Sequence, residues 1–100
     1  MKTMFEIEKF EFDGKVFHGI KSTIPNGPPL LLIKGNKGLV MCGYLSLEMA
    51  EQLGLVAAIV SGVNSFSDVL NASIKKSTNK AKEIGVEPGK KVREVISKLG

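Results

Sequence analysis

The sequence predicts a single α+β domain over residues 1–100, with a mainly antiparallel sheet of about five strands and helices that follow and pack on it. Three observations support this fold class: strand-like alternation with turn dipeptides in the first half, one wholly apolar run in the middle, and helical spacing towards the end. A chain of 100 residues with 43% apolar and 24% charged side chains has the size and composition of one globular domain.

The chain opens with a predicted β-hairpin. Apolar and acidic residues alternate over residues 5–12, but the phase slips at Lys9, which predicts a half-buried strand with a bulge. Asp13 and Gly14 form a dipeptide that favours a two-residue hairpin turn, and residues 16–24 form the returning strand. One face of that strand is expected to carry Val16, His18, Ile20 and Ile24. A lone histidine in this apolar company is expected to be packed and hydrogen-bonded.

A second hairpin and a crossover follow. Residues 30–34 and 38–45 flank Gly35-Asn36-Lys37-Gly38, a turn-like sequence that also matches the GXXG phosphate clamp of KH domains. That clamp needs a helix on each side, so we interpret the segment as a hairpin turn. Ser46 is a natural N-cap for a short helix, and the apolar run 55–60 predicts a buried central strand. If this strand runs parallel to residues 38–45, the short helix forms a right-handed crossover between the two.

The remaining chain is predicted to be helical. Ser65 with Asp68 three residues later approximates a capping box, and residues 73–84 favour a helix closed by Gly85. A last helix is expected after Pro88-Gly89, with a buried stripe formed by Val92, Val95, Ile96 and Leu99.

The net charge of +4 is unevenly distributed. Residues 1–74 contain six Lys and seven acidic residues, giving −1, whereas residues 75–100 contain eight Lys or Arg and three acidic residues, giving +5. A basic segment can indicate nucleic-acid binding. Here it contains one arginine, Arg93, and no aromatic residue, so nucleic acid is an unfavoured partner and solvated lysines are the simpler interpretation.

Several function classes lack their characteristic residues. One cysteine and one histidine exclude an intrachain disulfide and provide no basis for a metal site, and no nucleotide-binding glycine motif is present, so no cofactor is predicted. The longest apolar runs, residues 30–33 and 55–60, are too short to cross a membrane, and residues 1–12 lack the apolar core of a secretory signal. We therefore expect a cytoplasmic protein that does not bind membranes.

Two glycine-containing strand ends form the candidate ligand site. Cys42 is the candidate reactive residue, because a cysteine near a helix start can become a nucleophilic thiolate, although a buried cysteine in a strand is more often structural. The candidate ligand-binding residues are Gly43, Tyr44, Gly62, Asn64 and Ser65. They follow two predicted strands joined by one short helix, so we expect Cys42 and Gly62 to lie on neighbouring strands.

The chain resembles the YunC-like family of small bacterial and archaeal proteins, classed as a domain of unknown function. The resemblance rests on Gly38-Leu-Val-Met-Cys-Gly-Tyr-Leu45, on Ala57-Ala-Ile-Val-Ser-Gly-Val63, and on Ala81-Lys-Glu-Ile-Gly85 followed by Pro88-Gly89. It covers about residues 10–99 and implies a compact, oligomeric α+β domain with no established activity or catalytic residue.

Three functional hypotheses follow. The favoured one is a homo-oligomeric module without a recognisable catalytic motif, in which the amphipathic edge hairpin provides the pairing surface. The alternative is a small-molecule binding protein or enzyme with a site near Cys42 and the turn at residues 62–65. The weakest is nonspecific nucleic-acid binding through the basic residues 75–98.

Overall fold

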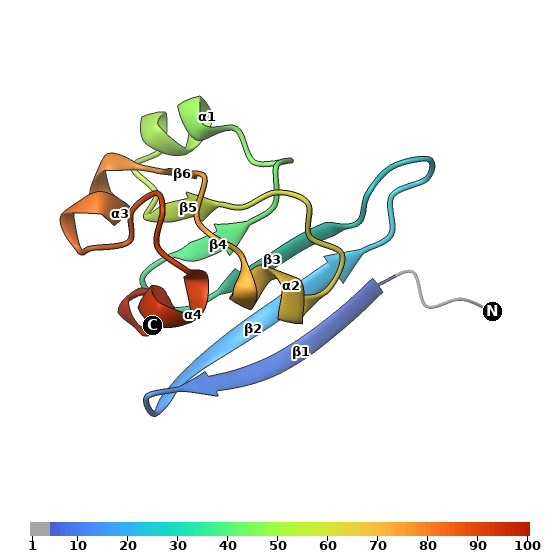
Figure 1. Ribbon diagram of the computed structural model, residues 1–100, viewed down its shortest axis with the longest axis horizontal. Helices are drawn as coiled ribbons and strands as arrows, with labels where there is room; N and C mark the ends of the chain where they lie inside the picture. The colour runs from blue at the N-terminus through green and yellow to red at the C-terminus, as the bar shows by residue number, and fades with distance from the viewer. Residues whose placement is uncertain (1–4) are drawn as a thin grey trace.

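The protein is described by a computed structural model that covers residues 5–100 and forms one six-stranded sheet with helices (Figure 1). The strands follow the order of the sequence, β1 to β6, and all neighbours are antiparallel except the parallel pair β4–β5. The strands are β1 (Phe5–Phe12), β2 (Lys15–Ser22), β3 (Leu30–Lys34), β4 (Leu39–Met41), β5 (Ala57–Ile59) and β6 (Lys76–Ser77). The helices are α1 (Leu47–Gln52), α2 (Phe66–Asn71), α3 (Asn79–Glu83), α4 (Val92–Val95) and the 3₁₀ helix η1 (Ile96–Leu99). The predicted α+β class is therefore confirmed.

The opening hairpin forms as predicted, but without a bulge. Asp13 and Gly14 have φ angles of 52° and 75°, the positive values that a type I′ turn requires. The β1–β2 register runs without interruption through Lys9, so the bulge expected there is wrong. The change of phase has another cause: Phe10 and Phe12 contact the core from one face of β1, whereas the apolar residues before Lys9 lie on the other face.

The main core lies between one face of the sheet, which we call the inner face, and the later helices. Its fully buried sheet residues are Phe17, Leu31, Ile33, Val40 and Ala58. They pack against residues of α2, α3, α4 and η1, which Figure 1 shows gathered beside the sheet. The predicted stripe of the last helix is confirmed, since Val92, Val95, Ile96 and Leu99 are all buried, although the helix tightens into η1 after α4.

The opposite face of the sheet, which we call the outer face, is exposed over the first strands. Val16, His18 and Ile20 share this face as predicted, and Ile24 lies beyond the end of β2. His18 is exposed and lies across from Lys9 and Lys34 in the neighbouring strands, so the expectation of a packed histidine is wrong. The reason is that the core takes the other set of β2 side chains, which includes Phe17.

The strands β4 and β5 run parallel and are joined by α1, so the crossover expected for parallel strands forms. The Ser46 hydroxyl accepts the Met49 N–H at 3.2 Å and caps α1, whose Ala50 is fully buried. All three residues of β5 are buried, which agrees with a strand covered on both faces. Two strands that run in the same direction next to each other therefore end at the same edge of the sheet.

The segment 73–84 differs from its prediction. Instead of one helix, it forms strand β6 and then the short helix α3, which raises the strand count from about five to six. The division occurs at Thr78, whose buried hydroxyl accepts N–H groups from Ala57 at 3.1 Å and Ala81 at 3.3 Å. This hydroxyl caps α3 and also ties it to β5, so a continuous helix cannot form there.

Candidate functional site

The candidate site lies where the chain leaves β4 and β5. Met41 pairs with Ile59 at the end of the parallel ladder, and the Val60 N–H donates to the Met41 carbonyl at 2.9 Å. This register brings Cys42 and Gly62 onto neighbouring strand ends, which confirms their predicted proximity. Carboxyl ends of parallel strands are common positions for ligand crevices because loops there can diverge and leave a hollow.

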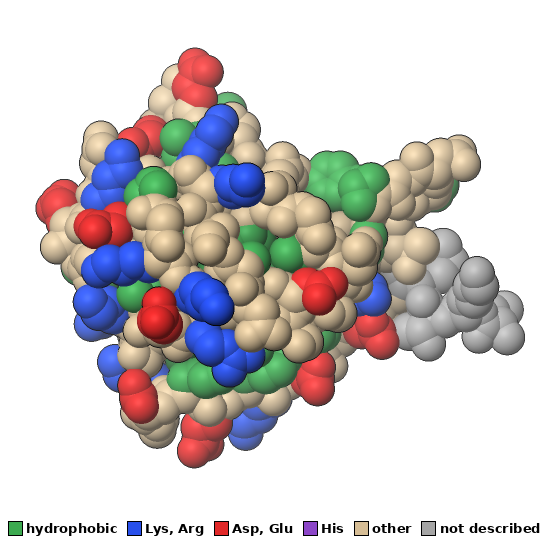
Figure 2. Space-filling view, viewed as in Figure 1, with side chains coloured by type: hydrophobic (Ala, Val, Ile, Leu, Met, Phe, Trp, Pro, Cys, Tyr) green, Lys and Arg blue, Asp and Glu red, His purple; other side chains and the backbone are tan. Residues whose placement is uncertain are grey.

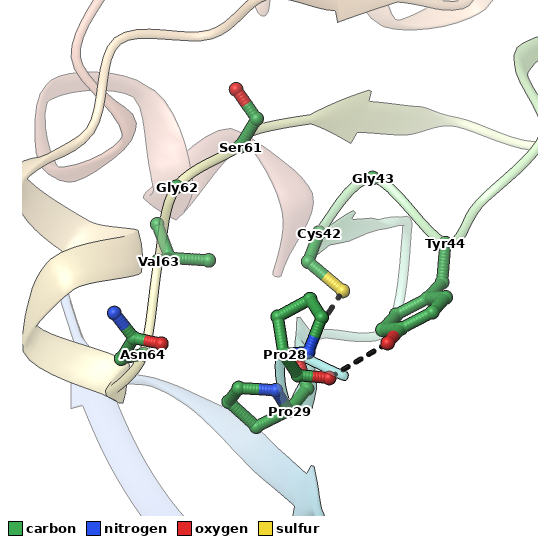
Figure 3. Close-up of a pocket in the computed structure, with 9 residues that line it drawn as sticks. All are labelled: Pro28, Pro29, Cys42, Gly43, Tyr44, Ser61, Gly62, Val63 and Asn64. Carbon is green, nitrogen blue, oxygen red and sulfur yellow. Dashed lines mark hydrogen bonds between the residues drawn. The ribbon is translucent and has the colours of Figure 1, made fainter. Parts of the chain in front are cut away.

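A hollow of about 420 Å³ lies between these strand ends, and we call it the strand-end cavity. Figure 3 shows segments 42–44 and 61–64 on opposite sides of it, with the two prolines of the β2–β3 loop closing a third side. Its lining residues are Pro28, Pro29, Cys42, Gly43, Tyr44, Ser61, Gly62, Val63 and Asn64. Its volume lies within the range of about 300–1,000 Å³ that is usual for small-molecule pockets.

Cys42 lies at the wall of the strand-end cavity and is only 5% exposed. Its backbone N–H donates to the Leu31 carbonyl at 3.0 Å, while its Sγ accepts the Leu31 N–H at 3.4 Å. The thiol also points to the Pro29 carbonyl, 3.9 Å away (Figure 3). These contacts fix the direction of the Cys42 side chain. Cys42 therefore joins β3 to the end of β4 and also lines the cavity.

Tyr44 forms the outer rim of the strand-end cavity. Its hydroxyl donates to the Pro28 carbonyl at 2.7 Å, which ties the β4–α1 segment to the β2–β3 loop. The side chain is 46% exposed, so this hydrogen bond lies close to solvent. The rim is held by one contact between two loops, and Figure 3 shows the ring beside the prolines.

The opposite wall is the loop that follows β5. Gly62 has a φ of +70°, and a Cβ built there would meet no atom within 4 Å. Val63 is buried and points across the cavity, and the Asn64 N–H donates to Asp68 Oδ2 at 3.0 Å. Ser65 does not line the cavity; its hydroxyl accepts the Asp68 N–H at 3.1 Å and caps α2.

Four lining residues were absent from the sequence prediction: Pro28, Pro29, Ser61 and Val63. Ser61 and Val63 adjoin Gly62 and follow from its placement. The position of the two prolines follows from the β3–β4 register. Leu32 pairs with Met41, so Leu31 lies opposite Cys42, and Pro28 and Pro29, which precede it, reach Tyr44. The turn at residues 35–38 was the available signal, because its length sets this register.

The chemistry of the strand-end cavity is that of recognition more than of proton transfer. Among the residues that the structure describes, its wall contains a thiol, a phenol, a hydroxyl and an amide, but no Lys, Arg, His, Asp or Glu. Within residues 5–100, no group of three His, Cys, Asp or Glu side chains is placed to hold a metal ion. Apolar contacts would provide most of the binding energy, with a few polar groups to orient a ligand.

The GXXG-like segment forms the β3–β4 turn, as expected. Its Lys37 and Gly38 N–H groups donate to the Leu99 carbonyl at 2.9 and 3.1 Å. The Gly35 N–H donates to the Gly38 carbonyl at 2.8 Å, across the turn. These amides are thus occupied by the protein itself and do not form a phosphate clamp.

The fold and the cavity define a class: small α+β proteins with one parallel strand pair in an otherwise antiparallel sheet and an apolar hollow at its carboxyl ends. The chain belongs to the family described as Domain of unknown function (DUF1805), whose model matches residues 41–99. This match contains both β4–β5 strand ends and confirms the YunC-like resemblance.

Two relatives extend the likeness over nearly the whole chain. The uncharacterized protein YunC of Bacillus subtilis is 24% identical over 100 residues, covering 96% of this chain and 98% of its own length. A crystal structure of a protein of unknown function from Thermoplasma acidophilum superposes with a TM-score of 0.93 at 42% identity, covering 97% of this chain and 94% of the other. None of the three descriptions states an activity.

No helix within residues 5–100 combines the length and the apolar character needed to span a membrane.

Proposed function

We propose that this protein binds a small, largely apolar molecule in the strand-end cavity. The observation that carries the proposal is convergence: three segments distant in sequence meet around one hollow of about 420 Å³. Gly43 and Gly62 leave open space on both sides, since a Cβ at either position would meet no atom within 4 Å. Cys42 and Asn64 provide polar atoms at the wall, and no charged side chain lines it.

The test is a titration of the ¹⁵N-labelled protein with 4-phenylbutanol, a neutral probe with an aromatic body and one hydroxyl. We expect saturable amide shifts confined to residues 42–44 and 61–64. Gly43→Leu should abolish these shifts, because Gly43 lines the cavity, a Cβ there meets no atom within 4 Å, and a larger side chain would take up space that the ligand needs. Met49→Leu is the matched control, since Met49 is 51% exposed on α1 and does not line the cavity. Absence of saturable shifts in the native protein would contradict the proposal.

A second proposal is self-association through the outer face of the first hairpin. Ile7 pairs with Ile20 and Ile20 with Leu32, which forms an apolar row across three strands. Ile7 is 63% exposed and Phe5 55% exposed, values that favour burial by a partner. β1 is also an edge strand of eight residues, so its outward N–H and C=O groups are available to a second copy.

Light scattering at tens of micromolar tests the self-association. We expect a mass that is a multiple of 10.8 kDa, and Ile7→Lys should reduce it to that of the monomer. Ile84→Lys is the control, because Ile84 is 40% exposed at the C-cap of α3, far along the chain from the hairpin. A monomeric native protein would refute this proposal and leave the first untouched.

For the cellular compartment we propose the cytoplasm, which an unpaired Cys42 favours.

Nucleic-acid binding through the basic residues 75–98 is the least favoured function. Figure 2 shows Lys and Arg side chains on the side of α3 and α4, interleaved with acidic ones, so these basic residues form no continuous stripe on this face. Fluorescence anisotropy should show that the protein does not bind random DNA or RNA at low salt. Binding that weakens as salt is raised would instead support the nucleic-acid hypothesis.

A further inference from the structure

A second hollow adjoins the strand-end cavity. It has a volume of about 310 Å³ and is lined in part by Gly43, Ser61, Lys75 and Lys76. Gly43 and Ser61 also line the strand-end cavity, so the two hollows adjoin on either side of these residues. A third hollow of about 360 Å³ shares Ser61 and is also lined by Lys75. Ser61 thus stands where an apolar cavity meets a surface that contains lysines.

The charge at this junction is positive. Among residues 5–100, the ion pairs are Lys21–Glu6 and Lys90–Glu87, so neither Lys75 nor Lys76 is neutralised by an acidic side chain there. The single acidic residue that lines any of the three hollows is Asp68. Its carboxylate already accepts the Asn64 N–H at 3.0 Å. An anion at the junction would therefore face two lysines and one engaged carboxylate.

The polar groups at the junction are oriented away from the apolar cavity. Figure 3 shows the Ser61 hydroxyl directed away from the Cys42 thiol and the prolines. The Lys75 backbone is fixed, because its N–H donates to the Ile59 carbonyl at 2.8 Å, two residues before Ser61 of the cavity wall. A ligand with an apolar body between Val63 and the prolines would have to extend past Gly43 to bring its other end to the hollow that Ser61 and Lys75 line.

We propose that the ligand of this site is a small amphipathic anion, with an apolar body in the strand-end cavity and a carboxylate-like group held by Lys75 and Ser61. This inference rests on the proposed small-molecule function and adds the chemical class of the ligand. Lys76 lines the same hollow and adds a second positive charge, while Gly43, which lines both hollows, places no side chain between them.

The test compares two probes that differ in one group: 4-phenylbutyrate, which is anionic, and 4-phenylbutanol, which is neutral. Both are titrated into the ¹⁵N-labelled protein, and amide shifts report where each one binds. We expect the anion to bind about fivefold more tightly than the alcohol, and to shift Lys75 in addition to the cavity residues. This preference should diminish as sodium chloride is raised, because salt screens exposed charges.

Variants separate the charge from the cavity. Lys75→Met should reduce the affinity for 4-phenylbutyrate to that for the alcohol and leave the alcohol unchanged, and Lys75→Arg should retain the preference. Lys82→Met is the matched control, an exposed lysine on α3 that lines none of the three hollows. Equal affinities for the two probes, or equal losses in Lys75→Met and Lys82→Met, would overturn the anion inference while the cavity proposal stands. Absence of binding by both probes would overturn both proposals.

Discussion

Gly19 should be among the positions least tolerant of an added methyl group. It lies on the inner face of β2, between the rings of Phe10 and Phe66, which meet edge to face with centroids 5.5 Å apart. A Cβ at residue 19 would lie 2.7 Å from Phe10 Cε2 and 2.7 Å from Phe66 Cε1. Ordinary van der Waals contact begins near 3.4 Å. Both rings would therefore have to move away from β2, and away from each other.

The cost can be estimated from these contacts. Overpacking of a tight core site costs about 1–3 kcal/mol, and disturbing an edge-to-face aromatic pair adds about 0.5–1.5 kcal/mol. Alanine recovers about 0.4–1 kcal/mol, because it restricts the unfolded chain more than glycine does. We therefore expect Gly19→Ala to lower the free energy of unfolding by about 2 kcal/mol. For a domain of this size the melting temperature should fall by about 10 °C.

Thermal unfolding followed by circular dichroism measures this change. Native and variant proteins must be compared at one protein concentration, because self-association makes the melting temperature depend on concentration. Gly43→Ala is the control: the added Cβ meets no atom within 4 Å, so its melting temperature should equal that of the native protein or exceed it by a few degrees, because alanine restricts the unfolded chain here too. If Gly19→Ala is as stable as Gly43→Ala, the close approach of the two rings does not restrict residue 19 and the reasoning fails.

Three further predictions concern buried polar groups. Ser77 Oγ is buried and has no hydrogen-bond partner within residues 5–100, so Ser77→Ala should leave the free energy of unfolding unchanged or raise it by up to about 1 kcal/mol. The adjacent Thr78 hydroxyl accepts N–H groups from Ala57 and Ala81, so Thr78→Val should lower it by about 1–3 kcal/mol. Urea denaturation measures the free energy of unfolding of both variants. Equal changes in Ser77→Ala and Thr78→Val would contradict the assignment of hydrogen bonds to the Thr78 hydroxyl alone. Because Cys42 is 5% exposed, its alkylation by iodoacetamide should be at least about tenfold slower in the native protein than in urea, measured by mass spectrometry; equal rates would show that the thiol is open.

Local sequence signals predicted the elements that depend on local chemistry. Asp13 and Gly14 adopt the positive φ angles of their turn, and Ser46 and Ser65 cap the helices that they precede. These features succeed because each needs only a few neighbouring residues. The proximity of Cys42 and Gly62 also followed from a short connection, since one helix of six residues leaves little room for another strand between β4 and β5.

The features that the sequence failed to predict depend on contacts between distant segments. β6 has only two residues and exists because it pairs with β5, a partner about 18 positions earlier in the chain. The distinction between the inner and outer faces of β2 could not be read from that strand, since both faces contain apolar residues and the helices decide which one is buried. The prolines of the cavity were missed for the same reason: a neighbouring strand brings them to Cys42.

The hydrogen bonds between the β3–β4 turn and Leu99 join two segments that are synthesised far apart in time. The turn ends at Gly38, and its partner carbonyl at residue 99 is synthesised 61 residues later. At roughly 5–20 residues per second, that interval is about 3–12 seconds. The first four strands can pair one after another during that time, but Phe17 and Ile33 would still lack the cover that Ile96 and Leu99 give them. On a ribosome, we expect part of the inner face of this sheet to remain uncovered until residues 96–99 have emerged.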